Sequence, residues 1–384
     1  MKLGLFLAAL VAASVGCSDD EHDTVARFDE TALQADLERT RQTTDIVGAL
    51  SEVVIPEGTI HARRGVAELG KDEPIPWDAH FRVASVTKTF VATVVLQLVG
   101  EGKLSLEDTL EKRLPGVVTG PGYDGNAITV RQLLQHTSGI YNYVEDPELQ
   151  KYLAEDLGRA LHDRTAPETL VAMAMKHPPN FAPGQGWDYS NTEYLLAAMI
   201  LKAITGHDWS DEVHQRIVVP LGLKHTFVTT TDPALPTPYA RTYMRMNDGS
   251  PPVDTTENTL EHTADSAIIS TTADLNQFFR ALITGKLLRS EELAEMQRTV
   301  PVPVPDVFGP AGTRAGLGIF WTPTACGGYW HHTGDSPIAP HTRTGVTPDG
   351  SRSLVISLTS GIDESSTNAA AFELAEHALC DLAK

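Results

Sequence analysis

The alternation of apolar and polar residues predicts strands near both ends of the chain and helices between them. Near the beginning, a polar helix is predicted over residues 30–47, and two strands follow at residues 53–55 and 59–69. Beyond residue 315 the pattern again favours strands and then ends in a helix. These last elements are predicted at residues 328–333, 341–346, 353–359 and 368–383.

A long apolar run predicts a helix over residues 85–99, which Gly100 and Gly102 would end. Apolar residues cover nearly all of its faces, which is typical of a helix buried on every side. Ser85 would then lie at the tip of a central helix, where backbone N–H groups point outward and favour negative charge.

The middle of the chain is mainly helical, with patterns that proline and glycine interrupt. A later helix starts after a Ser-Thr-Thr segment, in which Ser270 or Thr271 is a plausible N-cap. The helices predicted most clearly cover residues 128–134, 192–205, 209–218 and 264–282.

The economical packing of these elements is one sheet made from both chain ends, with helices on its faces. A mainly helical region would be inserted between those ends. The predicted fold class is therefore α+β, within a domain over residues 30–384. Its sheet subdomain would cover about 30–105 and 265–384, and its helical subdomain about 106–264.

The chain has 384 residues, of which 41% are hydrophobic, and a formal net charge of −20. This charge argues against nucleic acid as a partner, because a binder needs a basic face to neutralise phosphates. It also disfavours electrostatic docking on an anionic membrane, and its simplest role is solubility. No Cys/His spacing resembles a zinc site and no His-Glu-x-x-His occurs, so we expect no metal and no organic cofactor.

Residues 1–17 are typical of an export signal, with Lys2 as the positive start and a short apolar core behind it. The segment that ends in Cys17 resembles the lipobox of bacterial lipoproteins, in which the cysteine is lipidated, although Ser14 stands where leucine is usual. Ordinary signal cleavage is the alternative. Residues 18–29 resemble a polar tether. We expect a monomer that is exported, either secreted or held in the cell envelope by a lipid anchor as its only membrane contact.

Two cysteines, Cys326 and Cys380, remain after Cys17. In an oxidising compartment such a pair is a plausible disulfide, which would tie the C-terminal helix to a strand and stabilise the fold by about 4 kcal/mol. Two separate thiols are the alternative.

Ser85 and Lys88 are three residues apart and would share one face of a helix. A serine hydroxyl is a poor nucleophile at its free pKa. A neighbouring amine can accept its proton if burial or nearby charge keeps that amine neutral. Taken alone, the same spacing also fits an N-cap serine followed by a solvated lysine.

Two later segments could complete such a site. Tyr189 and Asn191 can face one cleft from a short loop, where a phenol can relay protons and an amide can orient a lysine and a substrate carbonyl. His332, Thr333 and Gly334 lie on a predicted strand, where the glycine would permit close approach of a substrate and the histidine could hold charge. Taken singly, the alternatives are a turn with a satisfied amide and a structural histidine.

In this order the three segments resemble the motifs of the penicillin-recognising serine hydrolases, which are Ser-x-x-Lys, then Tyr-x-Asn or Ser-x-Asn, then Lys-Thr-Gly or His-x-Gly. The resemblance covers about residues 45–382 and is to the branch with class C beta-lactamases and D-Ala-D-Ala carboxypeptidases, especially the Streptomyces-type secreted enzymes. It implies a beta-lactamase/transpeptidase-like fold with an antiparallel sheet, and one disulfide at Cys326 and Cys380. Supporting segments are residues 129–139, 220–223, 269–275 and 316–318.

The resemblance also implies roles for the matching residues. Ser85 would be the acylated nucleophile, Lys88 its proton acceptor, and Tyr189 the relay for the leaving group and the deacylating water. Asn191 would contact the substrate amide, and His332 would replace the usual lysine of the third motif.

Other positions would shape the substrate site. Thr333 and Gly334 would complete the third motif, and the backbone N–H groups of Ser85 and Asp335 would form the oxyanion hole. His136, which lies in a supporting segment, is interpreted as structural.

Two positions depart from the carboxypeptidase pattern. Phe320 stands where those relatives carry an arginine that clamps the peptide's terminal carboxylate, and Asp335 stands where they carry a small hydroxyl residue. The loss of a cation and the gain of an anion both disfavour a free C-terminal carboxylate. Phe320 and Asp335 are therefore candidate substrate-binding residues that leave the substrate open.

The leading hypothesis is a serine hydrolase that acylates Ser85 with a small or peptidoglycan-like amide, lactam or ester, as a DD-peptidase or beta-lactamase does. An esterase, or a peptidase or amidase for D-amino-acid substrates, is the alternative within this chemistry. The alternative of another class is a catalytically silent protein that binds peptidoglycan stems. An alpha/beta hydrolase is disfavoured because the sequence contains no Gly-x-Ser-x-Gly.

Overall fold

The computed structural model describes residues 28–44, 46–228, 231–244, 251–303, 308–359 and 364–381. The predicted export signal with Cys17, and most of the predicted tether, lie outside the described residues, so both stay predictions. In the part of the chain that is described, no helix is both long enough and apolar enough to cross a membrane.

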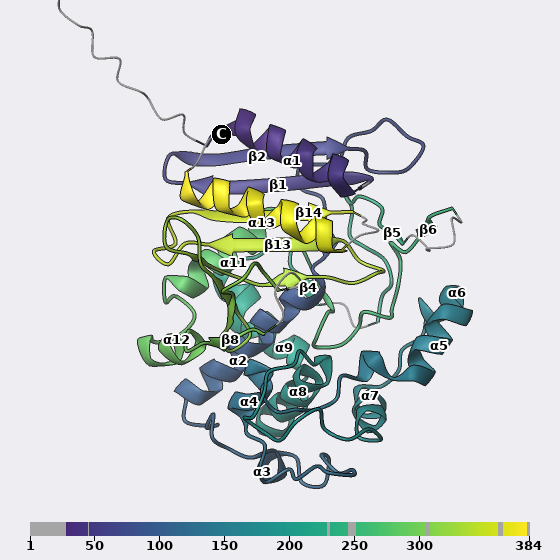
Figure 1. Ribbon diagram of the computed structural model, residues 1–384, viewed down its shortest axis with the longest axis vertical. Coiled ribbons are helices and arrows are strands. Elements are labelled where there is room, and N and C mark those ends of the chain that lie inside the picture. The colour runs from purple at the N-terminus through teal and green to yellow at the C-terminus, as the bar shows by residue number, and fades with distance from the viewer. Residues whose placement is uncertain are drawn as a thin grey trace, which may run out of the picture.

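The main sheet is antiparallel and is made from both ends of the chain, as predicted (Figure 1). Its strand order is β2-β1-β14-β13-β11-β10-β9-β8, and the short β12 pairs with β13. β1 pairs with the adjacent β2 and with the distant β14, in a register that places Ala49 opposite Leu358. The strands are β1 (Gly48–Ile55), β2 (Gly58–Gly65), β8 (Val300–Pro301), β9 (Arg314–Ala315), β10 (Phe320–Thr322), β11 (Tyr329–His331), β12 (Thr333–Gly334), β13 (His341–Val346) and β14 (Ser353–Leu358).

Helices cover both faces of this sheet. α1 (Glu30–Thr44) and α13 (Glu364–Cys380) pack side by side on one face, and α11 (Thr272–Ile283) packs against β1, β13 and β14 on the other (Figure 1). Leu33 and Leu37 of α1 are fully buried in a cluster with apolar residues of the sheet and of α13, because they recur on one face of the helix. The structure contains the disulfide between Cys326 and Cys380, with Cα atoms 5.5 Å apart, and it joins the end of α13 to the loop after β10.

The helical half of the molecule surrounds α2 (Thr87–Gly100), which follows directly on Ser85 (Figure 1). The other helices in the described residues are α3 (Leu110–Arg113), α4 (Val130–Gln135), α5 (Pro147–Glu155), α6 (Leu157–Ala160), α7 (Pro167–Ala174), α8 (Asn191–Thr205), α9 (Trp209–Val213), α10 (Val219–Leu221) and α12 (Ser290–Met296), with short helical turns at η1 (Ala84–Val86), η2 (Tyr143–Glu145) and η3 (His214–Val218).

The helix predicted over residues 264–282 begins later than expected. Residues Ile268–Ser270 form strand β7, which pairs with β3 (Phe81–Arg82) and β4 (Phe227–Val228), because β-branched residues suit a buried strand. Thr271 is the N-cap of α11, and its side chain accepts a hydrogen bond from the Asp274 N–H. A separate pair of short strands is β5 (Tyr243–Met244) and β6 (Val253–Asp254).

α2 is buried on nearly all sides, as its sequence predicts. Its exposed or partly exposed positions are confined to Gln97, Val99 and Gly100. Phe90 stacks on Phe278 of α11 with ring centroids 3.7 Å apart. A helix held on every face gives its first turn a fixed position; Lys88 lies in that turn, and Ser85 lies in η1 directly before it.

Candidate active site

The backbone turn before Ser85 has a conformation that residues with a Cβ rarely adopt. Ala84 has a φ of 47°, in the left-handed region, where a residue with a Cβ is strained. The same turn touches β12, because a Cβ on Gly334 would lie 2.2 Å from the Val83 carbonyl oxygen. The glycine that was predicted to admit a substrate instead admits the chain's own backbone. Its effect is to bring Asp335, the next residue, close to Ser85.

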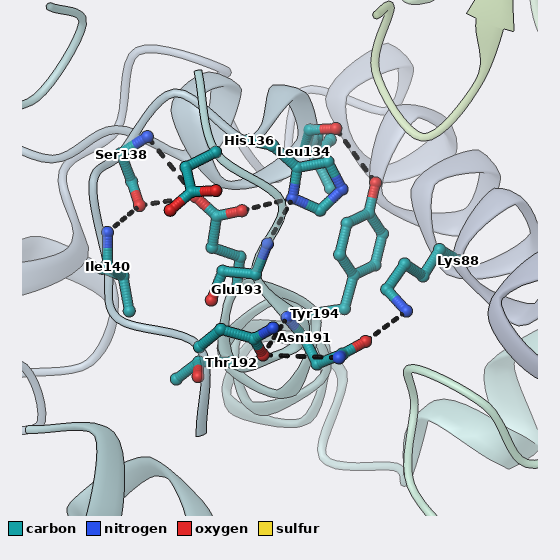
Figure 2. A network of polar contacts seen from close by, with 12 residues as sticks. Lys88, Leu134, His136, Ser138, Ile140, Asn191, Thr192, Glu193 and Tyr194 are labelled. Carbon is teal, nitrogen blue, oxygen red and sulfur yellow. Dashed lines mark hydrogen bonds and ion pairs between the residues drawn. The ribbon is translucent and has the colours of Figure 1, made fainter. Parts of the chain in front are cut away.

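Lys88 is fully buried and has three oxygen partners. Its Nζ lies 2.9 Å from Ser85 Oγ, 2.7 Å from Asn191 Oδ1 and 2.9 Å from the Asp265 backbone oxygen. Figure 2 shows Lys88 and Asn191 in contact at the edge of a larger polar network. Three segments that are far apart in the sequence thus converge on one amine.

The chemistry of these three oxygens suits Lys88 as a base. Burial lowers the pKa of Lys88 to about 8, which outweighs the opposing effect of nearby carboxylates such as Asp265. The oxygens of Asn191 and Asp265 can only accept, so a neutral amine donates its two hydrogens to them. The remaining lone pair then faces the Ser85 hydroxyl, which becomes the donor.

Tyr189 lies beside this pair. Its ring is under the Lys88 ammonium, with Nζ 4.9 Å from the ring centroid. Its hydroxyl is buried without a hydrogen bond of ordinary geometry to any described residue, although Ser85 lies near enough to lower the pKa of the phenol. Burial dominates and raises that pKa well above its usual range, so Tyr189 is a phenol that can donate a proton.

His332 is buried and neutral. Burial, with the nearby Lys88 charge, lowers its pKa to about 3, so of the two capacities that the sequence allowed, charge and hydrogen bonding, hydrogen bonding is the one favoured. Its Nδ1 lies 2.6 Å from the Thr333 carbonyl oxygen, which can only accept, so Nδ1 carries the hydrogen. Nε2 is then a buried acceptor without a partner among the described residues.

Asn191 begins α8 and is held by a residue that the motif does not include. Asn142 Oδ1 accepts from the Asn191 N–H at 3.0 Å and from Nδ2 at 3.3 Å, which turns Oδ1 of Asn191 toward Lys88. The side chain therefore orients the amine, and the second hydrogen of its Nδ2 can reach a substrate.

Asp335 is not an isolated anion. Its Oδ1 accepts from Arg343 Nη2 at 2.7 Å and lies 2.8 Å from His341 Nδ1. These two neighbours hold the pKa of the carboxyl well below its usual range despite its burial. The repulsion of a substrate carboxylate that the sequence suggested is thus weakened by a buried guanidinium.

Phe320 is buried in a group of aromatic rings around the Tyr189 and His332 side chains. Phe308 joins this aromatic cluster, with its ring centroid 5.3 Å from Phe320 and 4.7 Å from Tyr189. Phe320 also meets the His332 ring edge to face at 5.1 Å. The position that holds an arginine in carboxypeptidases is therefore an apolar wall here, completed by the partly buried Trp187.

A second polar network lies next to Asn191 (Figure 2). Glu193 Oε2 is 2.5 Å from His136 Nδ1, and Glu193 Oε1 accepts from the Ser138 hydroxyl. Because the Ser190 N–H also donates to His136 Nδ1, that nitrogen carries no hydrogen, and Glu193 must be the donor. Burial, which raises the pKa of Glu193 and lowers that of His136, gives the same result of two neutral groups. A structural role for His136 agrees with this arrangement.

The sequence did not identify several residues that shape the site. Asn142 lies three residues beyond a recognised segment, so extending that segment would have found it. Arg343 and Phe308 gave no signal, because their proximity to Asp335 and Phe320 depends on strands and loops from different parts of the chain.

Ser85, Lys88 and Tyr189 thus form one cluster beside an antiparallel sheet made from both chain ends. The sequence matches the pattern of the beta-lactamase family over residues 33–379, and the chain belongs to that family.

Similar proteins extend this assignment. The structure of a D-stereospecific amidohydrolase from Streptomyces sp. is 36% identical, with a TM-score of 0.83 over 93% of this chain and 100% of the other. A D-amino acid amidase from Ochrobactrum anthropi SV3 is 27% identical, with a TM-score of 0.75 over 90% of this chain and 97% of the other. Esterase EstB of Burkholderia gladioli is 34% identical in a match that covers 56% of this chain and 54% of the esterase. The chain spans only about half the length, or less, of the curated relatives it matches first.

Proposed function

We propose that this protein hydrolyses amide or ester bonds through an acyl-enzyme on Ser85, and that its substrates are D-aminoacyl derivatives. One observation carries the proposal, which is the position of a buried, readily neutralised Lys88 at 2.9 Å from the Ser85 hydroxyl. A lysine with that pKa is roughly one-fifth neutral near physiological pH, far more than an ordinary lysine, and its lone pair faces the proton that must be removed.

The proposed reaction uses groups already in place. Ser85 Oγ bonds to the substrate carbonyl carbon while its proton passes to Lys88 Nζ, and backbone N–H groups of Ser85 and Asp335 bind the oxyanion. The carbon–nitrogen or carbon–oxygen bond then breaks, and the leaving group takes the Tyr189 phenol proton, which Lys88 replaces. Water next attacks the acyl carbon, loses one proton to this relay and releases the acid, and Ser85 recovers its proton.

The aromatic cluster favours a leaving group without a carboxylate. Phe320 is 2% exposed and lies against Phe308 and His332, so no cation is available at that position to hold an anion. An amide or ester end loses little by contact with such a wall, whereas a carboxylate loses its hydration. This supports amides and esters over peptides with a free terminal carboxylate. The names of the similar amidohydrolase and amidase support D-amino-acid substrates.

The first test is covalent labelling with a fluorophosphonate. The wild type should gain one adduct per chain, and Ser85→Ala should gain none and should lose turnover of a short nitrophenyl ester. Ser290→Ala is the matched control, because Ser290 is exposed at the start of α12. Absence of an adduct on the wild type would indicate a binding protein, and an adduct on Ser85→Ala would contradict the assignment of the nucleophile.

The second test is a substrate panel with the Ser85→Ala control. It compares a D-Ala-D-Ala peptide, its C-terminal amide, a D-phenylalanine amide, a cephalosporin and a nitrophenyl ester. The amides and the ester should be hydrolysed with higher kcat/KM than the free peptide. A preference for the free peptide or the cephalosporin would instead favour carboxypeptidase or beta-lactamase activity.

A further inference from the structure

We propose that a cavity between α11 and β1 is a second binding site, and that it takes a free α-amino acid with an apolar side chain. The cavity has a volume of about 460 Å³, which is within the range of small-molecule sites. No described residue that lines it belongs to the active site at Ser85. This second site is separate from the proposed function and does not depend on it.

Asn276 of α11 supplies a buried acceptor that lacks a donor. The residue is 1% exposed, and its Nδ2 donates to the Glu52 backbone oxygen at 3.1 Å and to Glu52 Oε1 at 3.2 Å. A backbone oxygen can only accept, so the nitrogen of the amide must face it. Oδ1 is therefore left buried, with no hydrogen-bond partner among the described residues. Such an atom is costly, and because Asn276 lines the cavity, a ligand there can bring the missing donor.

Arg280 supplies a cation that is already held in position. Its Nε donates to the Gly350 carbonyl oxygen at 2.9 Å, and no described residue accepts a hydrogen bond from Nη1 or Nη2. A Cβ on Gly350 would lie 2.6 Å from Thr284 Cγ2, so this glycine lets the turn after β13 reach the end of α11. A guanidinium with one anchored nitrogen and two open ones is suited to bidentate binding of a carboxylate.

Lys286 adds a second positive charge to the lining of the cavity. It is exposed and forms no ion pair with any residue that the structure describes. The chain as a whole carries a formal net charge of −20, so two lining cations without ion-pair partners are a local exception. Together, Arg280 and Lys286 favour an anionic group on the ligand.

The polar groups are spaced for a molecule whose two charges lie close together. Asn276 and Arg280 are four residues apart on α11, so their side chains are neighbours on one face, with Cβ atoms about 5–6 Å apart. Glu52, which is bonded to Asn276, adds negative charge at the first of these two positions. An α-amino acid matches this spacing, because its ammonium can donate to Asn276 Oδ1 beside Glu52 while its carboxylate accepts from Arg280.

The apolar part of the lining indicates the kind of side chain that the ligand carries. Val54 and Leu221 line the cavity and are only partly buried by the protein itself. An apolar side chain placed against them would remove further apolar surface from water, which is favourable. We therefore expect an amino acid such as leucine rather than a charged one.

The test is a calorimetric titration with D-leucine and with L-leucine. It uses the fluorophosphonate-labelled protein, in which Ser85 is blocked, so that binding at the active site does not contribute. At least one enantiomer should bind with one molecule per chain, and Arg280→Gln and Lys286→Glu should each raise its Kd at least tenfold. Lys224→Glu is the matched control and should leave Kd unchanged, because Lys224 is exposed and lies outside the cavity.

Two analogues separate the charges of the ligand. Leucinamide lacks the carboxylate and N-acetyl-leucine lacks the ammonium, so each should bind at least tenfold more weakly than leucine. N-acetyl-leucine that bound as tightly as leucine would overturn the free amino acid as the ligand and would indicate the C-terminus of a peptide instead.

Other results would overturn the site itself. These are the absence of binding at millimolar leucine, or a Kd that is the same in the wild type and in both cavity variants. If Arg280→Gln does not fold, Lys286→Glu decides, because Lys286 is exposed and its substitution disturbs no buried contact. A wild type that is not labelled would contradict the proposed function alone, since the same titration of the unmodified chain and its variants still decides whether the cavity binds leucine.

Discussion

Two buried polar clusters lie side by side along the first turn of α8 (Figure 2). They differ in how far their polar atoms are satisfied by hydrogen bonds within the protein. The catalytic cluster comprises Ser85, Lys88, Tyr189, Asn191 and His332. The second cluster, which we call the acid–imidazole network, comprises His136, Ser138 and Glu193. Asn191 and Glu193 are two residues apart and belong to different clusters, although both are buried or nearly so.

The difference lies in which polar atoms are left without partners. Both carboxyl oxygens of Glu193 are engaged, by His136 and by Ser138, and in this network only His136 Nε2 is buried without a hydrogen-bond partner among the described residues. In the catalytic cluster the Tyr189 hydroxyl and His332 Nε2 are buried without partners among the described residues. Buried polar atoms are normally satisfied, so a donor and an acceptor left open beside a nucleophile mark the place of a substrate. The acid–imidazole network, by contrast, holds the loop before α8 in position.

Lys88→Met should give the largest effect and should separate activity from stability. Loss of the base is expected to lower kcat/KM about 1,000-fold, because general base catalysis contributes on this scale. The free energy of unfolding should fall by no more than about 1–2 kcal/mol, because relief from burying the amine offsets part of the cost of leaving Asn191 Oδ1 and the Asp265 carbonyl without this donor. Steady-state kinetics and urea unfolding of the same preparation measure both. A variant that remained active but unfolded more easily would reverse the roles assigned to the two clusters.

Glu193→Ala should show the opposite behaviour. It removes the acceptor of the Ser138 hydroxyl and one of the two donors to His136 Nδ1, and it leaves a cavity, so we expect a loss of about 3 kcal/mol in the free energy of unfolding. Glu193→Gln keeps a donor for the imidazole and should lose about 1 kcal/mol. The folded fraction of each variant should still be labelled at Ser85 by a fluorophosphonate. Unfolding curves that matched the wild type would show that the acid–imidazole network is not structural.

The comparison also shows what the sequence could predict. Spacing and order identified Ser85, Lys88, Tyr189 and Asn191, and the structure brings all four together. The sheet from both chain ends and the buried α2 could also be predicted, because the periodicity of apolar residues indicates which faces are buried. These features depend on local patterns or on motifs with fixed spacing.

The charge states of the site residues could not be predicted from the sequence. The sequence left open whether His332 holds charge, and burial favours the neutral form, while the charge of Asp335 is balanced by Arg343. Both outcomes depend on which distant segments surround a group in the fold, and the residues next to it in the sequence do not indicate those segments. The left-handed turn at Ala84 was likewise hidden, since alanine gives no signal for such a conformation.

The pH dependence of kcat/KM should distinguish the two clusters by charge. Only neutral Lys88 can accept the Ser85 proton, and its pKa is about 8. The rate should therefore fall about tenfold per pH unit below pH 8 and level off above it, while Tyr189 stays protonated. Glu193→Gln should leave the midpoint in place, because Glu193 is already uncharged. A midpoint that moved to lower pH in this variant would show that Glu193 is ionised and acts on Lys88.

Ala84→Gly should give the smallest effect and addresses backbone strain. Each cluster has one residue in the left-handed region within it or next to it: Ala84, which precedes Ser85, has a φ of 47°, and His136 has a φ of 60°. Histidine visits this region more readily than alanine, so the strain should be greater beside the nucleophile. Glycine would relieve about 1–2 kcal/mol of strain at Ala84 but would add entropy to the unfolded chain, so a net stabilisation of about 0.5–1 kcal/mol is expected. Urea unfolding measures the gain, and the fluorophosphonate labelling rate should fall slightly because Ser85 is held less firmly. A loss of stability would show that the surrounding packing, rather than strain, dominates at this turn, and the contrast between the two clusters would then be one of satisfied and open polar atoms alone.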